Sequence, residues 1–248
     1  MPLANIPVFE RLTINALSRA LKKGWQSFLL TRPLSVSYAM IFAIVGMVIL
    51  VGIEHASFAP MIFPFAGGFM LIGPVLLCGF FSMADRIQRG ETCTFRDVVS
   101  GYSRTSREML SIAFVCTLLF IIWITDAAIL YGFVVGRLPV PLQMLVFPAG
   151  NVISFLFWSS LLGLVLAFLI FAISAFSIPL LYYRRTSLVR AVHLSVAAVF
   201  ANLAPCLLWA MTLSVAIIAS IFIFPLFLLT FPVLAFASHA LYRELFPE

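Results

Sequence analysis

Charged side chains are scarce in this chain of 248 residues: they make up 10% of it, whereas 63% of its residues are hydrophobic. Soluble domains are about 25% charged, so the composition excludes an ordinary water-soluble fold. Mean hydropathy is +1.15, and several apolar runs reach the roughly 18 residues that indicate a membrane-spanning helix. The sequence therefore predicts an all-α, polytopic membrane protein that forms one integral membrane domain over residues 1–248.

Histidine is also scarce, with three residues, and none is spaced from another histidine or a cysteine as metal ligands are. The four cysteines include no C-x-x-C pair and are expected to be free thiols in apolar surroundings. The chain has no H-E-x-x-H, G-x-S-x-G, Walker or G-x-G-x-x-G motif. We therefore predict a non-enzymatic protein without a metal or a cofactor.

Basic residues indicate the orientation of six expected spans, at about 34–54, 59–83, 109–135, 152–183, 204–221 and 223–241. Every lysine and arginine except Arg137 lies before the first span, between the second and third, between the fourth and fifth, or after the sixth. Because cytoplasmic loops carry the basic excess, we expect both termini in the cytoplasm. The net charge of +6 follows from insertion and from attraction to anionic lipids, so we predict membrane lipids, and no nucleic acid, as partners.

An amphipathic segment precedes each pair of spans. The first lies within residues 1–33, carries apolar side chains on one face and basic ones on the other, and is expected to form a cytoplasmic helix in the plane of the lipid headgroups. The third copy matches the first in register. Arg19-Ala20 corresponds to Arg190-Ala191, and Tyr38–Met40 corresponds to Trp209–Met211.

The sequence thus predicts three helical hairpins, each preceded by an interfacial amphipathic helix, as internal repeats over 9–90, 91–185 and 186–248. Repeats inserted in the same sense imply a pseudo-symmetry axis along the membrane normal. The second span of each pair carries a proline, namely Pro74, Pro179 and Pro232, and each is expected to kink its helix because proline removes an amide donor.

Asp126 is the one carboxylate deep in an apolar run, "FIIWITDAAILYG". Such residues usually face a protein interior or a cavity, and Glu54 and His55 are expected at a similar outer depth on the first span. These three residues form the candidate intramembrane polar site. Its alternative interpretations are a protonatable or substrate-binding group and a structural hydrogen bond. Gly67, Gly68 and Gly73 are expected to permit close helix packing.

Several stretches resemble one family over nearly the whole chain. They include "LKKGWQSFLLTRPLSVSYAMIFAIV", "GGFMLIGPVLLCGFFSMADRIQRGE", "TFRDVV", "FAISAFSIPLLYYRRTSLVRAVHLSVAAVFANLAPCLLWAM" and "PVLAFASHALYREL". The family is a bacterial group of integral membrane proteins known as domain of unknown function 2189. The resemblance implies a multi-pass protein of the bacterial inner membrane, and some members are loosely labelled as similar to a cytochrome c oxidase subunit. This chain has too few histidines to hold the haems and copper of the catalytic subunit.

Two functional hypotheses follow. The first is an accessory, assembly or scaffold component of a membrane complex, respiratory complexes included, which acts through a protein partner or as a homo-oligomer. The alternative is a small-molecule or ion permease that uses Asp126 as its protonatable or binding group. Repeats and kinked helices are typical of transporters, whereas the scarcity of polar groups at the midplane favours the first hypothesis, and a lipid-like substrate would weaken that objection.

Overall fold

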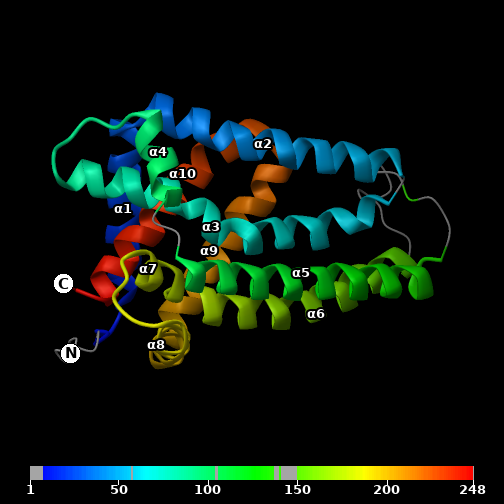
Figure 1. Cartoon of the computed structure of the whole chain (residues 1–248). Coiled ribbons are helices and arrows are strands. Elements are labelled where there is room, and N and C mark those ends of the chain that lie inside the picture. Colours follow the sequence, from blue (N-terminus) through cyan, green and yellow to red (C-terminus); the bar gives the residue numbers. More distant parts are fainter. Residues whose placement is uncertain (1–7, 57, 104–105, 137–139, 141–149, 248) are drawn as a thin grey trace.

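The computed structural model describes residues 8–56, 58–103, 106–136, 140 and 150–247, without the side chains of residues 63, 66–76, 221, 222 and 224. Within these residues the regular structure is helical, as the sequence predicts. Four long helices run side by side along the molecule (Figure 1), namely α2 (Arg32–His55), α3 (Ile62–Gln88), α5 (Arg107–Val134) and α6 (Gly150–Ser174).

The four long helices have the length that a membrane span requires. At 1.5 Å per residue, helices of 24 to 28 residues are about 36–42 Å long, which exceeds the roughly 30 Å of a hydrocarbon core. By length and composition, five described helical segments could cross a membrane, and α3, with 27 residues, has the length of a sixth. An all-helical fold with five to six apolar candidate membrane helices among the described residues is thereby confirmed.

The last two helices of the chain are arranged differently from the four long helices. α9 (Leu203–Phe222) and α10 (Phe224–Leu245) cross the long helices obliquely, and their junction lies beside the middle of α2 (Figure 1). Phe231 of α10 accordingly packs on Phe42, in the middle of α2, with ring centroids 5.7 Å apart. The predicted organisation in three hairpins stays a prediction.

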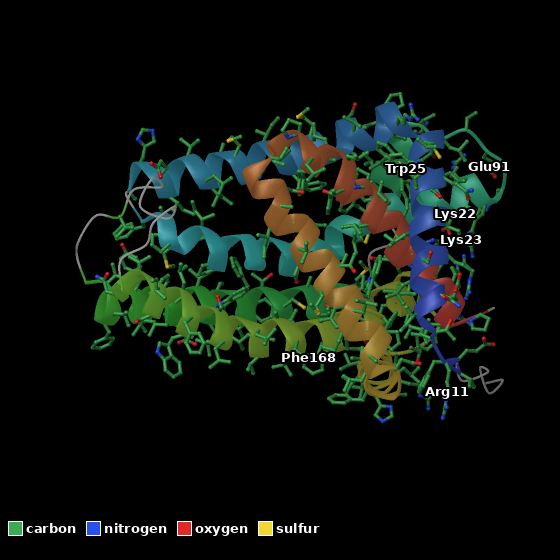
Figure 2. All side chains as sticks on the ribbon, turned by 180° about the vertical axis from the view of Figure 1, so that it is seen from behind. Arg11, Lys22, Lys23, Trp25, Glu91 and Phe168 are labelled. Carbon is green, nitrogen blue, oxygen red and sulfur yellow. The ribbon has the colours of Figure 1, made fainter. Side chains whose placement is uncertain are left out.

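Three shorter helices lie at the end of the bundle that holds both termini, which we call the basic end (Figure 1). They are α1 (Ile14–Leu30), α4 (Phe95–Ser103) and α8 (Leu188–Ala201). Arg11, Lys22 and Lys23 lie at this end (Figure 2). α1 packs along α10, α4 on α3, and α8 on α6 and on the short helix α7 (Ser177–Tyr182).

Most of the apolar face of α1 is covered by protein. Ala16, Leu17 and Phe28 are buried, whereas Trp25 is exposed. Gly24 approaches α10 so closely that a Cβ atom there would lie 2.5 Å from the carbonyl oxygen of Val233. Packing on α10 therefore accounts for the amphipathic pattern of this segment. Its expected position in the headgroup plane stays a prediction.

The first and third amphipathic helices end alike. Thr31 ends α1 and begins α2 with φ −126° and ψ 23°, while Asn202 ends α8 and begins α9 with φ −123° and ψ 42°. The register that aligns Arg19 with Arg190 also aligns Thr31 with Asn202. The internal repeat itself stays a prediction.

Candidate functional site

The residues of the expected site around Asp126 lie on two helices. Asp126 is half-buried on α5, and no residue in the described part of the chain gives it a hydrogen bond or an ion pair. Glu54 and His55 are exposed in the last turn of α2. No polar contact joins Asp126 to either of them among the described residues, so the role of this carboxylate stays a prediction.

The three prolines have different surroundings. Pro179 follows a break in the helix, because α6 ends at Ser174 and α7 begins at Ser177. Ser195 of α8 fills that break: its Oγ accepts from the backbone N of Phe176 at 3.2 Å and donates to the carbonyl of Ala172 at 2.8 Å. Such side chains satisfy backbone groups that a broken helix frees inside a membrane.

Pro232 lies inside α10, which continues from Phe224 to Leu245. Pro74 lies on α3, together with Gly67, Gly68 and Gly73, in the stretch whose side-chain surroundings lie outside the described residues. The kink at Pro74 and the close packing at the three glycines therefore stay predictions.

A buried polar cluster joins the ends of three helices at the basic end of the bundle. Asp85 lies near the end of α3, Tyr183 directly follows α7, and His239 and Arg243 lie one turn apart on α10. The Tyr183 hydroxyl donates to Asp85 Oδ1 at 2.6 Å and lies 2.8 Å from His239 Nε2. Because the hydroxyl has one proton, which Asp85 accepts, the proton in the second bond belongs to His239 Nε2.

Charge in this cluster is balanced locally. The side chains of Asp85 and His239 are 7% and 3% exposed, and Arg243 Nη2 lies 3.5 Å from Asp85 Oδ1. The Arg243 guanidinium also lies over the Tyr183 ring, 4.8 Å from its centroid. Burial, and then the negative charge of Asp85, raises the pKa of Tyr183 far above its ordinary value, so the hydroxyl keeps its proton at physiological pH.

The sequence patterns did not predict this cluster. Asp85 lies two residues after the expected span 59–83, and His239 lies near the end of the expected span 223–241. Two signals were present: His239 and Arg243 lie four residues apart on one helix, and Asp85 and Arg243 each lie eleven residues after a proline, Pro74 and Pro232 respectively. Within the described residues no three His, Cys, Asp or Glu side chains gather as a metal site requires.

A cavity of about 570 Å³ lies between α3, α5, α6, α7, α9 and α10. Along α6 its lining extends from Ser159 to Ser174, about 22 Å at 1.5 Å per residue. Its walls are mainly apolar, and Phe168 contributes to them on α6 near the crossing of α9 (Figure 2). The described lining residues include no charged side chain, and Asp126 is not among them.

Few polar groups face this cavity. Trp123 of α5 lies against Gly163 of α6, where a Cβ atom would be 2.5 Å from the indole ring. Its Nε1 has no hydrogen-bond partner among the described residues. Ser174 and Ser238 also line the cavity, and neither forms a hydrogen bond with any described residue. The arrangement is that of an elongated apolar site with a few unpaired hydrogen-bonding groups, which suits a long-chain ligand.

Comparison with functionally described proteins and with solved structures finds no match. A family model described as "Predicted integral membrane protein (DUF2189)" matches residues 62–183. This segment runs from α3 to α7 and contributes Asp85, Tyr183 and the α5–α6 wall of the cavity. Residues 62–183 are thus similar to the DUF2189 family of predicted integral membrane proteins.

Proposed function

We propose that this chain is a non-catalytic protein of the bacterial inner membrane that binds a long-chain apolar molecule within the bilayer. Both termini lie in the cytoplasm in this proposal, and the protein acts as an accessory component of a membrane complex, with a protein partner or a second copy of itself. The observation that carries the proposal is the elongated apolar cavity between α6 and α9.

The volume and the walls of the cavity support this class of ligand. Sites for small molecules usually measure about 300–1,000 Å³ and are lined mainly by apolar and aromatic side chains, and this cavity fits that description. Its length along α6, about 22 Å by helical rise, suits an extended acyl or isoprenoid chain better than a compact metabolite.

The proposal can be tested by filling the cavity. Ala210 of α9 lines it, so Ala210→Phe would place a ring in the space that the ligand needs. Ala128→Phe is the matched control, because Ala128 is exposed on α5 and lies outside the described lining. The tagged protein would be purified in mild detergent, and native mass spectrometry would count the bound long-chain molecules and any protein partner.

The expected result is a stoichiometric long-chain molecule on the unaltered protein and on Ala128→Phe, and at least tenfold less on Ala210→Phe. Equal occupancy of all three proteins would contradict the assignment of the cavity. So would the lack of any bound chain in the unaltered protein. An absorption spectrum of the same sample would reveal a haem-bearing partner.

Asp126 favours a second candidate function, a permease in which this carboxylate is protonated and deprotonated. A half-buried carboxylate without a described partner is costly in a spanning helix, about 1–3 kcal/mol at the outer depth expected for Asp126. The test is proton flux into proteoliposomes, followed with a trapped pH-sensitive dye. Asp126→Asn should abolish the flux, while Glu108→Gln, on the exposed first turn of α5, should not. Equal flux in both variants would refute the permease.

A further inference from the structure

We propose that the cavity selects an uncharged amphiphile, a long chain that ends in a hydroxyl or carbonyl group, and that this polar group bonds to the hydroxyl of Ser174. The inference rests on the proposed function, because it names the class of molecule that the same cavity binds. It is carried by the lack of charge in the described lining and by the unpaired polar side chains there.

The bilayer limits what the apolar walls can contribute to selection. Lipid tails are as apolar as leucine or phenylalanine side chains, so a chain gains little free energy from the hydrophobic effect when it moves from lipid into the cavity. Packing and the few polar contacts must therefore decide which molecule is preferred. The polar groups of the lining are accordingly the residues that determine specificity.

The charge of the described lining excludes ionic headgroups from the interior. Burying a phosphate or carboxylate is very unfavourable without a paired cation, and none of the described residues that line this cavity is a lysine, arginine or histidine. The nearby cation Arg243 lies at Asp85 and is not part of the lining. An uncharged hydroxyl or carbonyl avoids this penalty.

Ser174 is the polar group most suited to contact the ligand. In the spanning helices, several hydroxyl side chains bond to the carbonyl four residues earlier, as Thr117, Ser154 and Thr212 do. Ser160 and Ser214 of the lining form no such bond, but both are exposed. Ser174 forms no such bond, although it is only 8% exposed. It is the last residue of α6, directly before the break that precedes α7, and its hydroxyl is left for a molecule in the cavity.

Ser238 provides another unpaired hydroxyl, from α10. Leu234 and Leu241, about one turn to either side of it on the same helix, also line the cavity. The wall formed by α10 is thus apolar with one hydroxyl in it. A monoalkyl alcohol or a monoacylglycerol matches this pattern, since each has one polar end and one chain.

The experiment compares four probes of equal chain length on the purified full-length protein: hexadecane, hexadecan-1-ol, hexadecanoate at pH 8 and hexadecyl phosphate. Binding would be followed by the fluorescence of Trp123 and Trp209, which both line the cavity. Hexadecan-1-ol should bind at least tenfold more tightly than the two anions. Ser174→Ala should weaken the alcohol about three- to tenfold, the range of one net hydrogen bond, and leave hexadecane unchanged.

Two variants separate loss of the bond from loss of the fold. Ser174→Thr retains a hydroxyl and should retain most of the affinity for hexadecan-1-ol, and Ser154→Ala, on the exposed side of α6, should have no effect. Equal affinity for the alcohol and the anions would overturn the proposal, as would an unchanged affinity in Ser174→Ala. If none of the four probes binds, the proposed function itself fails, which is a different outcome from loss of selectivity.

Discussion

Gly24 provides the sharpest test of how α1 is held against α10. A Cβ atom at this position would lie 2.5 Å from the carbonyl oxygen of Val233 and 2.8 Å from the backbone nitrogen of Ala237. Both are backbone atoms, so no side-chain rotation relieves the overlap, and α1 must move away from α10. We therefore expect Gly24→Ala to destabilise the protein, although alanine favours a helix more than glycine does.

The magnitude follows from two opposing terms. Overpacking costs about 1–3 kcal/mol, and backbone atoms on α10 put this site near the upper value. Replacing glycine by alanine inside a helix stabilises the helix by about 1 kcal/mol. The net loss is about 2 kcal/mol, which corresponds to a fall in Tm of about 4–8 °C for a chain of this size.

Gly46 is the matched control. It lies in the middle of α2, and a Cβ atom there would meet nothing within 4 Å. Gly46→Ala should therefore have only the stabilising effect of alanine in a helix, without steric overlap, and raise Tm by about 2–4 °C. Tm would be measured from tryptophan fluorescence in one detergent at one heating rate, because unfolding of membrane proteins is often irreversible and its midpoint then depends on the rate.

A compensating variant isolates the cause. Ala237→Gly removes the Ala237 Cβ atom, which lies 2.8 Å from the added Cβ, but it leaves both backbone contacts. The double variant should therefore regain only part of the lost stability. If Gly24→Ala and Gly46→Ala changed Tm in the same direction, α1 would not pack on α10 as described and the reasoning would be refuted.

The remaining predictions concern the polar groups at the basic end. Tyr183→Phe removes the hydroxyl that links Asp85 to His239 and should cost about 1–3 kcal/mol, as an unsatisfied buried group does; an unchanged Tm would contradict the cluster. Hydrogen bonds from Thr94, followed by the charge of Arg86, hold the pKa of Asp97 below its ordinary value despite opposing burial. A depressed pKa stabilises the fold above about pH 3.9, the ordinary value for aspartate, and this contribution is lost as the pH falls through the folded-state pKa. Asp97→Asn should therefore raise the rate of amide hydrogen exchange in α4 at pH 6. The difference in this rate between the variant and the unaltered protein should shrink toward pH 3. A difference that stays constant with pH would refute the stabilising role of ionised Asp97.

The length of each apolar run was sufficient to predict most of the long helices from the sequence. A run of about 20 apolar residues is the condition for crossing a bilayer, and this property is local to each segment. The described helices therefore begin and end within a few residues of the expected spans. The break before Pro179 could also be anticipated, because the lost amide donor is a property of proline itself.

Only the tertiary structure decided what covers each helix face. The pattern of α1 shows that one of its faces is apolar, but a lipid headgroup layer and the surface of α10 satisfy the same pattern, and in this fold α10 covers most of that face. Gly24 and Gly46 are likewise indistinguishable in sequence, although one contacts a neighbouring backbone and the other is surrounded by open space.

The functional features depend on the tertiary structure for the same reason. The polar cluster joins Asp85, Tyr183 and His239 from three segments that are distant in the chain, and the described lining of the cavity comes from six helices. Composition and periodicity describe one segment at a time, so they determined that this protein is a helical membrane protein. The contacts that form the cluster and the cavity exist only where separate helices meet, and these contacts were decided by the packing of the whole bundle.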